Sequence, residues 1–280
     1  YTYTFTTPAI EKVRSGDNIF DTVSLDDLPE AGEYGKPILP VKELRLLIPY
    51  GYEVSSIDVN PSEPISLGSG YILQLGGKDV PLFLLETSPL HIRDDEQYPS
   101  TGLFPDSLFD LIGTYGFRGY QILYVNLNPV HYQALTGELS YYAEMNLILK
   151  MDKASTVSIN ELYRGSDSDK TQLKGKVDNL EVSDTYLSIE RQTRDDYELL
   201  IITTDALKTC FEPLAEFHTS QGVPTRIATL SEIGSADPEA IRSFIRSAYL
   251  NHSIEYVLLG GDADVVPARM LWVTSGYGDT

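Results

Sequence analysis

Two residue types in this chain could support covalent catalysis: a single cysteine and four histidines. A thiolate near the start of a helix acts as a nucleophile when an imidazole lies within hydrogen-bond reach. The histidine nearest in sequence to Cys210 is His218, but eight residues of helix would separate the two by about 12 Å. Cys210 also shares an apolar helix face with Leu207, Phe211 and Leu214, so we expect it to pack in a core. The sequence predicts no cysteine–histidine dyad here.

The four histidines favour structural roles. His218 and His252 fall near the C-termini of expected helices, where the helix dipole favours a partly positive imidazole. His91 and His131 are isolated in expected loops or strand ends. No pair of histidine or cysteine residues has the spacing of zinc ligands, so the sequence predicts no zinc site.

Carboxylates are better placed as metal ligands than as catalytic acids or bases. Asp262 and Asp264 follow an apolar run that ends in Gly260-Gly261, and functional loops lie at the carboxyl ends of parallel strands. Oxygen clusters of this type suit calcium, although the twelve-residue calcium-loop pattern is absent. The alternative is that Asp262 caps the next turn, and that the acidic clusters at 94–96 and 167–169 are solvated loop charge. Calcium is therefore expected at most as a structural ion, and no cofactor is required.

The composition excludes several classes of partner. The chain carries 41 acidic and 21 basic residues, a net charge of −20 that is spread along its length. Such a surface repels phosphate backbones, so nucleic-acid binding is not expected. No apolar run of about 18 residues occurs, so no transmembrane segment is expected. Dinucleotide, phosphate-loop and serine-esterase motifs are also absent.

The elements that would position Asp262 alternate between strand and helix from residue 197 onward. Apolar runs at 197–203, 225–230 and 255–259 predict buried parallel strands. Between them, apolar residues at helical spacing predict one helix that stops at Gly222 and begins shortly before Pro213, which lacks an N–H. A second helix is predicted from the N-cap Asp237 and from Pro238, and runs to about residue 251. Short connections of this kind imply right-handed crossovers.

The first 154 residues show a different pattern. Short runs rich in Tyr, Thr, Val and Ile lie between turn signals, which predicts an antiparallel β-sandwich, jelly-roll-like, without long helices. In the run 120–127, Leu123, Val125 and Leu127 alternate with more polar positions and are predicted to face the core. The chain therefore reads as a β-domain over 1–154 followed by an α/β unit over 197–280.

Residues 155–196 are rich in Ser, Asp, Lys and Thr, which indicates a solvated linker that proteases can reach. If the chain is processed by a protease that prefers basic residues, this region offers the cleavage positions Arg164, Lys170, Lys174, Lys176, Arg191 and Arg194. The alternative is a plain linker, and the sequence does not choose one bond.

Several segments, in order, resemble one family. Tyr197-Glu-Leu-Leu-Ile-Ile-Thr203, the run Phe211-Glu-Pro-Leu-Ala-Glu-Phe-His-Thr-Ser-Gln-Gly222 and Tyr256-Val-Leu-Leu-Gly-Gly-Asp262 are similar to the start of the gingipain-type cysteine peptidase domain. Gly35-Lys-Pro-Ile-Leu-Pro40 and the run 129–139 resemble the propeptide of that family. The ordered set covers about a third of the chain in the peptidase part and about half of the first domain.

This resemblance implies a caspase/gingipain-like α/β fold and a precursor of a secreted or cell-surface cysteine endopeptidase. The prodomain would keep the peptidase latent and assist folding, with its own peptidase domain and peptide substrates as partners. The family's catalytic His and Cys would lie beyond Thr280, so this chain alone is expected to be inactive. Because the chain begins at Tyr1 without a leader, we interpret it as a piece of a longer protein. Residues 93–104 and Arg118 are predicted to contact the active-site cleft.

Two other functions fit the same residues. One is a non-catalytic surface or adhesion module that binds a cation or a partner. The other is an inactive peptidase relative that keeps the fold without the dyad. A His-Gly pair and a Cys downstream of this chain would favour the active peptidase over both.

Overall fold

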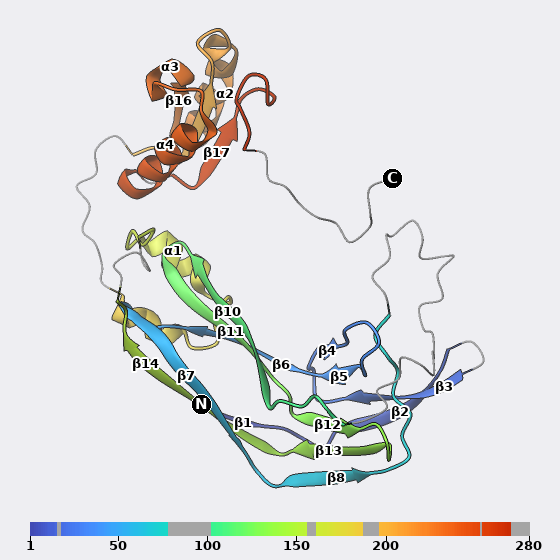
Figure 1. The fold of residues 1–280 in the computed structure, drawn as a ribbon. Coiled ribbons are helices and arrows are strands. Elements are labelled where there is room, and N and C mark those ends of the chain that lie inside the picture. Colours follow the sequence, from blue (N-terminus) through green and yellow to red (C-terminus); the bar gives the residue numbers. More distant parts are fainter. Residues whose placement is uncertain (16–17, 78–101, 156–160, 187–195, 253, 270–280) are drawn as a thin grey trace. The chain divides into compact units, whose positions relative to one another are not determined.

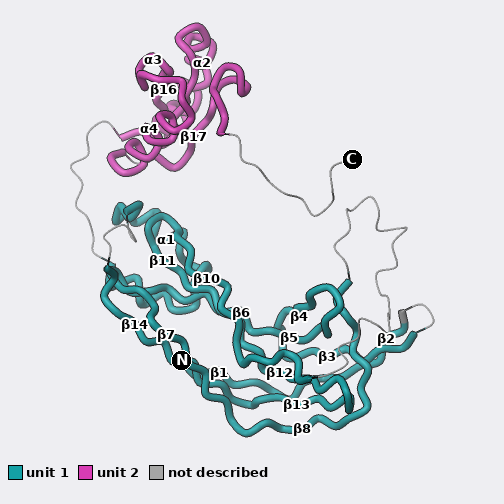
Figure 2. Tube along the Cα trace, in the orientation of Figure 1, with its two compact units in different colours: residues 1–188 teal, residues 189–280 magenta. Residues whose placement is uncertain are grey.

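A computed structural model describes residues 1–280 except 16–17, 78–101, 156–160, 187–195, 253 and 270–280. The chain forms two compact units, Tyr1–Ser188 and Ile189–Thr280, which Figure 2 colours separately. Unit 1 is built almost entirely from antiparallel strands, and unit 2 from a parallel sheet with helices. The predicted order of a β-sandwich followed by a parallel α/β unit is confirmed. No helix in the described part of the chain is long and apolar enough to span a membrane.

The described residues of unit 1 form fourteen strands and two helical segments. The strands are β1 (Thr2–Thr4), β2 (Ala9–Ser15), β3 (Asn18–Ser24), β4 (Glu30–Ala31), β5 (Leu39–Pro40), β6 (Lys42–Leu47), β7 (Tyr52–Pro61), β8 (Pro64–Gly68), β9 (Leu103–Phe104), β10 (Phe109–Phe117), β11 (Tyr120–Leu127), β12 (Val130–Gln133), β13 (Glu138–Tyr142) and β14 (Glu144–Lys153). The helical segments are α1 (Asp167–Leu173) and the 3-10 helix η3 (Leu180–Thr185).

One half of unit 1 is a sandwich of two three-stranded sheets, β1-β14-β7 and β10-β11-β6 (Figure 1). Alternate residues of β11 and β6 face inward, and they pack with Met145 and Leu147 of β14. Leu123, Val125 and Leu127 lie in this core at 1% exposure or less, which confirms their predicted orientation. The other half joins β8-β13-β12-β9 to the ribbon β2-β3 around a second core.

The β10–β11 hairpin turns through two residues with positive φ. Arg118 has φ 50° and Gly119 has φ 84°, and two left-handed residues in succession match the twist of the flanking strands. A β-bulge between Leu111 and Gly113 interrupts the pairing further along β10. The turn places the Arg118 side chain at the end of the sheet, next to the segment that comes after β14.

That segment, residues 161–186, is called the strap from here on. Its apolar side chains Leu173, Val177 and Tyr186 are buried against the outer face of the β10-β11-β6 sheet, where Tyr120 and Ile122 are 1% exposed. The strap therefore belongs to unit 1, and the solvated linker predicted over 155–196 is shorter than expected. The correction has a physical reason: Ile122 and Leu47 make the second sheet face apolar too, so it requires cover.

The strap also covers the free edge of β6. Arg45 N donates to Asp178 Oδ2 at 2.7 Å, and Asp178 N donates to Arg45 O at 2.8 Å. Leu47 N donates to Asn179 Oδ1 at 2.7 Å, and Asn179 Nδ2 donates to Leu47 O at 3.0 Å and to the hydroxyl of Tyr1 at 2.9 Å. Backbone groups of β6 that would face solvent or another strand are thus paired within the unit.

Unit 2 carries the parallel sheet β16-β15-β17, made of β15 (Leu199–Thr203), β16 (Thr225–Thr229) and β17 (Tyr256–Leu259). Its helices are α2 (Lys208–Ser220), α3 (Leu230–Ile233) and α4 (Pro238–Asn251). The side chain of Asp237 caps α4 by accepting from Glu239 N and Ala240 N, as predicted. Gly222, at φ 87°, ends α2 as predicted, but α2 begins at Lys208 and runs through Pro213.

The core of unit 2 lies between the sheet and the pair α3–α4. Leu200, Ile202 and Ala228 of the sheet pack there against Ile241 and Ala248 of α4. Helix α2 has no buried residue, and its Phe217 is 58% exposed. The edge strand β17 is equally open, because Tyr256 and Leu259 are 60% and 48% exposed.

Candidate functional sites

The carboxyl ends of the three parallel strands meet at one edge of unit 2. Thr203, the last residue of β15, donates its hydroxyl hydrogen to Gly260 O at 2.7 Å, and both residues are buried. A side chain on Gly260 would lie 2.6 Å from the Phe211 ring, and one on Gly261 would lie 2.4 Å from Val265. The glycines therefore allow β17 to end close beneath α2 and turn away sharply. Crevices at such strand ends are where open α/β sheets bind ligands.

Asp262 and Asp264, the predicted metal ligands, come after this turn and are exposed. Asp262 Oδ1 accepts from Asp264 N at 3.1 Å, and Asp262 O accepts from Val265 N and Val266 N at 3.0 and 2.8 Å. Asp262 thus caps the next turn, the alternative that the sequence left open. No group of three metal-ligating side chains forms in the described part of the chain, while calcium takes six to eight oxygens. The calcium site stays a prediction.

A polar contact at the same edge was not foreseen from the sequence. The Asp205 carboxylate, two residues beyond β15, accepts a hydrogen bond from the Ser231 hydroxyl, two residues beyond β16. Hydrogen bonds from Ser231 and Thr229 hold the pKa of Asp205 below its usual value. The available signal was positional, because Asp205 and Ser231 each lie just beyond the end of a predicted strand. Among the described residues, the carboxyl edge thus presents an ionised carboxylate and hydroxyl groups, without an imidazole.

Cys210 is exposed, which corrects the prediction that it packs in a core. The half-buried positions of α2 are Phe211, Ala215 and His218, at spacings of four and three residues. Cys210 lies one position away from this stripe, so the helix turns its thiol toward solvent. His218 is in the last turn of α2 and therefore far along the helix from Cys210.

The two other described histidines lie away from the thiol. His252 stacks on Tyr197 with ring centroids 4.6 Å apart, at the end of α4. His131 is buried in unit 1 and meets Tyr142 edge-on. His91 lies outside the described residues. Cys210 is therefore not brought next to a histidine in the part of the chain that the structure describes.

The predicted cleavage positions fall into two groups. Arg164, Lys170, Lys174 and Lys176 lie on the strap, whereas Arg191 and Arg194 lie outside the described residues. Lys170 pairs with Asp184 at 2.9 Å across the strap surface, and Lys176 lies 5.0 Å above the Phe117 ring. The use of any of these positions stays a prediction, but Arg164 is not accessible in the folded unit.

Arg164 is 1% exposed and forms a two-point ion pair with Asp169. Its Nε donates to Asp169 Oδ2 at 2.6 Å, and its Nη2 donates to Oδ1 at 2.8 Å. Arg118 adds a third bond from Nη1 to Oδ1 at 2.5 Å. Burial alone would raise the pKa of Asp169, but the hydrogen bonds from the two guanidinium groups outweigh it and hold the pKa below its usual value. Asp169 is a buried anchor and not the loop charge that was expected.

The region predicted to contact the active-site cleft is only partly described. Residues 93–101 lie outside the described residues, and Leu103–Phe104 forms β9, which pairs with β12. Arg118 turns toward Asp169, and its side chain is 21% exposed. The guanidinium of Arg118 is therefore engaged within unit 1, and its role in the cleft stays a prediction.

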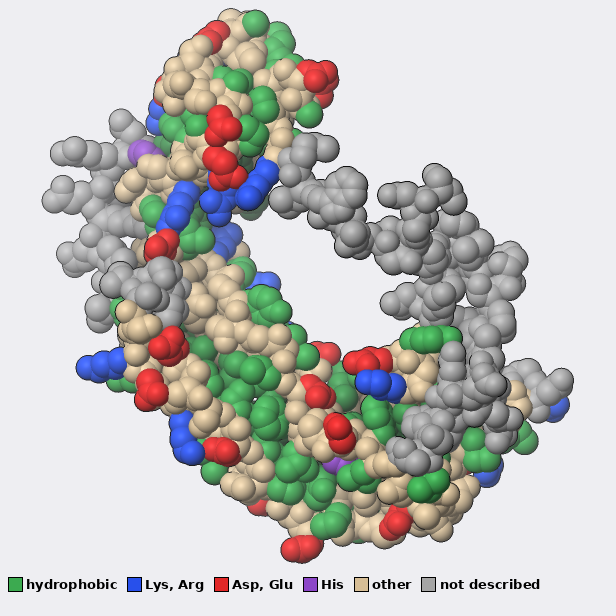
Figure 3. All heavy atoms as spheres, in the orientation of Figure 1, with side chains coloured by type: hydrophobic (Ala, Val, Ile, Leu, Met, Phe, Trp, Pro, Cys, Tyr) green, Lys and Arg blue, Asp and Glu red, His purple; other side chains and the backbone are tan. Residues whose placement is uncertain are grey.

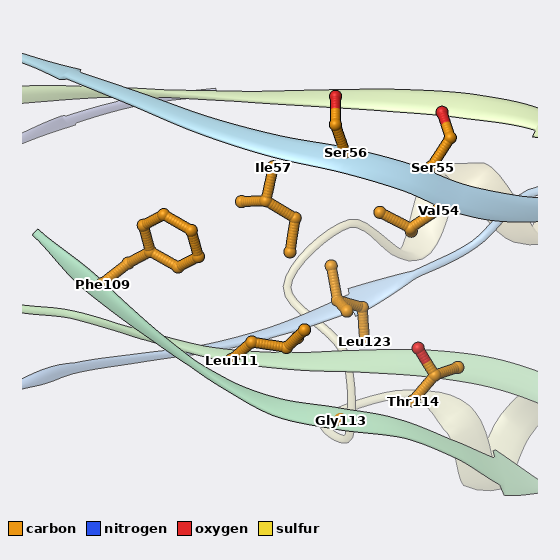
Figure 4. Close-up of a pocket in the computed structure, with 9 residues that line it drawn as sticks. All are labelled: Val54, Ser55, Ser56, Ile57, Phe109, Leu111, Gly113, Thr114 and Leu123. Carbon is orange, nitrogen blue, oxygen red and sulfur yellow. The ribbon is translucent and has the colours of Figure 1, made fainter. Parts of the chain in front are cut away.

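An apolar groove opens at the edge of the sandwich, between β7 and β10. Its volume is about 290 Å³, and in Figure 4 the side chains of Val54, Ile57, Phe109 and Leu123 converge on it. None of its lining residues is charged: Val54, Ser55, Ser56, Ile57, Phe109, Leu111, Gly113, Thr114 and Leu123. The face drawn in Figure 3 shows acidic side chains scattered over both units, with hydrophobic patches over the strands of unit 1.

Comparisons with known proteins agree with this division into units. A family model described as Propeptide_C25 matches residues 1–162, and one described as Peptidase family C25 matches residues 192–279. A search of curated proteins gives no match. The propeptide match covers more than half of the chain and ends where the strap begins.

Two solved structures from Porphyromonas gingivalis are similar at low identity. A chain in a complex of RgpB pro- and mature domains is 15% identical, with a TM-score of 0.49, over 64% of this chain and 90% of that chain. A gingipain K structure described in terms of zymogenic latency is 19% identical, with a TM-score of 0.41, over 53% of this chain and 84% of that chain. The family models, rather than these likenesses, carry the assignment.

Proposed function

The chain belongs to peptidase family C25, as a propeptide followed by the first part of the peptidase domain, and we propose that it is the latency-keeping portion of a secreted cysteine endopeptidase precursor. The observation that carries this proposal is the order of the two family matches, each on its own packed unit. Unit 1 has its own cores and covers its own sheet face. It can therefore act as a separate folded body toward the peptidase domain.

The reaction of the full-length protein is peptide-bond hydrolysis with a cysteine nucleophile. A thiolate attacks the scissile carbonyl carbon, a histidine passes the proton to the leaving amine, and backbone N–H groups stabilise the oxyanion. Water then releases the acyl group from the sulfur. Cys210 is not the nucleophile in this proposal, because it is exposed on α2 and has no histidine beside it among the described residues. This chain contributes the parallel sheet whose carboxyl edge supports the site.

The partners in this proposal are peptide substrates and the protein's own peptidase domain. Unit 1 keeps the peptidase latent until a protease cuts between the units, and it assists folding of the domain that comes after it. The acidic charge of −20 spread over the chain suits a protein that stays dispersed outside the cell. Calcium is not needed for this proposal and stays a prediction: Asp262 acts as a turn cap, and no group of three metal-ligating side chains forms in the described part of the chain.

The experiment is intact-mass analysis of the full precursor over time, with and without a thiol alkylator, beside a Cys210→Ser version. Alkylator-sensitive cleavage that survives Cys210→Ser is expected, because the nucleophile lies outside this chain. Loss of cleavage in a folded Cys210→Ser precursor would make Cys210 the nucleophile. A precursor that stays whole in every sample, even after addition of an activating protease, would favour a binding module or an inactive relative instead.

A further inference from the structure

We propose that the Arg164–Gly165 bond is a cryptic proteolytic site, kept closed by the ion pairs of Asp169 with Arg164 and Arg118. While the cluster is intact, the strap remains part of the propeptide as one uncut piece. When the cluster opens, a protease with a preference for basic residues can remove the strap and uncover the sheet face beneath it. The proposal rests on the proposed function in one respect: the protease that would cleave this bond in the precursor is taken to be the protein's own peptidase.

The first argument concerns the side chain. A protease that selects basic residues must take the arginine side chain into a pocket of its own. The Arg164 guanidinium is 1% exposed and is already bound at two points, with Nε and Nη2 at 2.6 and 2.8 Å from Asp169. Two-point pairs between a guanidinium and a carboxylate are among the stronger charge-assisted hydrogen bonds. The folded strap and a protease therefore compete for the same group.

The second argument concerns the backbone next to the bond. Gly165 has φ 65°, in the left-handed region, and Ser166 is the N-cap residue of α1, with its backbone O accepting from Lys170 N at 3.1 Å. Helix α1 begins at Asp167, so only Gly165 and Ser166 separate the bond from a helix. Cleavage needs an extended backbone on both sides, which this geometry does not offer until the strap opens.

The third argument concerns the packing of the strap against the β10–β11 turn. A side chain on Gly119 would lie 2.0 Å from Tyr163 N, so the strap enters directly against the β10–β11 turn. Tyr163 packs against Tyr120 and Tyr186, with ring centroids 5.3 and 5.2 Å apart. At the far end, Tyr186 donates its hydroxyl hydrogen to Ile48 O at 2.8 Å. Two elements therefore keep the Arg164–Gly165 peptide bond in place: the strap itself and the β10–β11 turn.

The covalent step is a simple hydrolysis. One water is consumed, the bond from Arg164 C to Gly165 N breaks, Arg164 gains a carboxylate and Gly165 gains an amino group. No oxidant, metal or cofactor enters the balance. What the structure adds is the control of access, exerted by a carboxylate that touches neither the protease nor the broken bond.

The test uses trypsin on the chain of residues 1–280, with fragments identified by mass. In the native chain we expect cleavage after Arg164 to be at least tenfold slower than in Asp169→Asn, whose neutral amide replaces the carboxylate that both arginines bind. Asp184→Asn is the matched control, because Asp184 is an exposed strap carboxylate paired with Lys170. Its cleavage rate after Arg164 should equal that of the native chain.

An internal reporter separates local opening from unfolding. Lys150 lies in β14 and pairs with Ser56 of β7, so cleavage after Lys150 requires β14 to separate from its sheet. If Asp169→Asn is also cut after Lys150, this variant has unfolded more widely and does not test the local opening. Gly119→Ala then provides the test, because it displaces the strap without removing a charge. Cleavage of the native chain after Arg164 as fast as in the variants overturns the proposal, as does resistance of a folded Asp169→Asn or Gly119→Ala chain. Because trypsin supplies the activity, this result is independent of whether the precursor is itself a peptidase.

Discussion

Two apolar sheet faces in this molecule meet solvent very differently. On the outer face of the β10-β11-β6 sheet, Tyr120 and Ile122 are 1% exposed because the strap covers them. On the edge strand β17 of unit 2, Tyr256, Val257 and Leu259 are 60%, 39% and 48% exposed. Both sequences are rich in apolar residues, so composition alone does not decide which face is covered.

The difference lies in the cover that the rest of the chain supplies to each face. The strap is polar in composition, yet three apolar side chains, one buried carboxylate and the hydrogen bonds to β6 fasten it to the sheet. A few anchors can therefore turn a segment with the composition of a linker into part of a core. Substitutions beneath or within the strap should be costly, and matched substitutions on the open face of unit 2 should not.

The largest expected effect comes from breaking the buried anchor. Asp169→Asn leaves two arginines without their carboxylate, and removing one partner of a buried ion pair costs about 3 to 5 kcal/mol of unfolding free energy. Asp184→Asn, which removes an exposed pair with Lys170, should cost under about 1 kcal/mol. Urea unfolding of the two variants measures both values. Equal costs would mean that the Asp169 cluster does not fasten the strap.

The next effect compares the two faces directly. Ile122→Ala should lower the free energy of unfolding of unit 1 by about 2 to 5 kcal/mol, because it leaves a cavity beneath the strap. Val257→Ala on β17 should change the stability of unit 2 by about 0.5 kcal/mol or less, because that side chain already contacts water. Hydrogen exchange followed by mass spectrometry resolves the units separately. A large loss for Val257→Ala would show that its face is covered in solution.

A smaller effect depends on pH and on the buried His131 of unit 1. Burial lowers the pKa of His131 below its usual value, while the backbone near Asn128 and Pro105 opposes the shift in part. Above about pH 6.5 the imidazole is neutral in both states, and below it the unfolded chain binds the proton first. The free energy of unfolding of unit 1 should therefore fall as the pH decreases below about 6.5, by at most about 1.4 kcal/mol per pH unit.

The matched variant for this prediction is His131→Phe, which keeps an aromatic ring but has no proton to bind. Unfolding in urea at pH 7.5 and at pH 5.5 should give a smaller difference for this variant than for the native chain. An identical difference in both proteins would exclude His131 as the source of the acid sensitivity.

The smallest effect on stability is expected at Cys210. Because the thiol is exposed, a thiol reagent should modify the native chain without denaturant, at a rate within about tenfold of its rate in the unfolded chain. Cys210→Ser should change the free energy of unfolding by about 0.5 kcal/mol or less. Modification of Cys210 only after unfolding would show that the thiol is buried, as the sequence pattern predicted.

Much of the fold can be predicted from local sequence signals. The strand at 120–127, the capping of α4 by Asp237 and the stop of α2 at Gly222 are each predicted from residues within a few positions. These signals act locally, through backbone geometry and side-chain alternation, so the sequence carries them in full. The family resemblance likewise rests on ordered local segments, and the family models confirm it.

The features that the sequence does not predict depend on distant residues. The strap has the composition of a linker, and its place in unit 1 cannot be predicted from that composition. The contacts that fasten it, Asp169 with Arg118 and Asn179 with Leu47, connect positions far apart in the chain. The core position predicted for Cys210 is wrong because helical spacing fixes a stripe only to within about one residue position. At the strand ends, Asp205 and Ser231 meet only because parallel pairing brings the ends of β15 and β16 to the same level.

The side-chain amide of Asn179 joins Leu47 to the hydroxyl of Tyr1, and this has a consequence for synthesis on the ribosome. The hydroxyl of Tyr1 and the β6 edge at Leu47 acquire this shared partner only after Asn179, 132 residues beyond Leu47, has been translated. At common translation rates, roughly 3 to 13 seconds separate the synthesis of Ile122 from that of Tyr186. During that interval the nascent sheet shows an uncovered apolar face and an unpaired strand edge. Chaperone binding to the nascent propeptide should therefore end when the strap emerges.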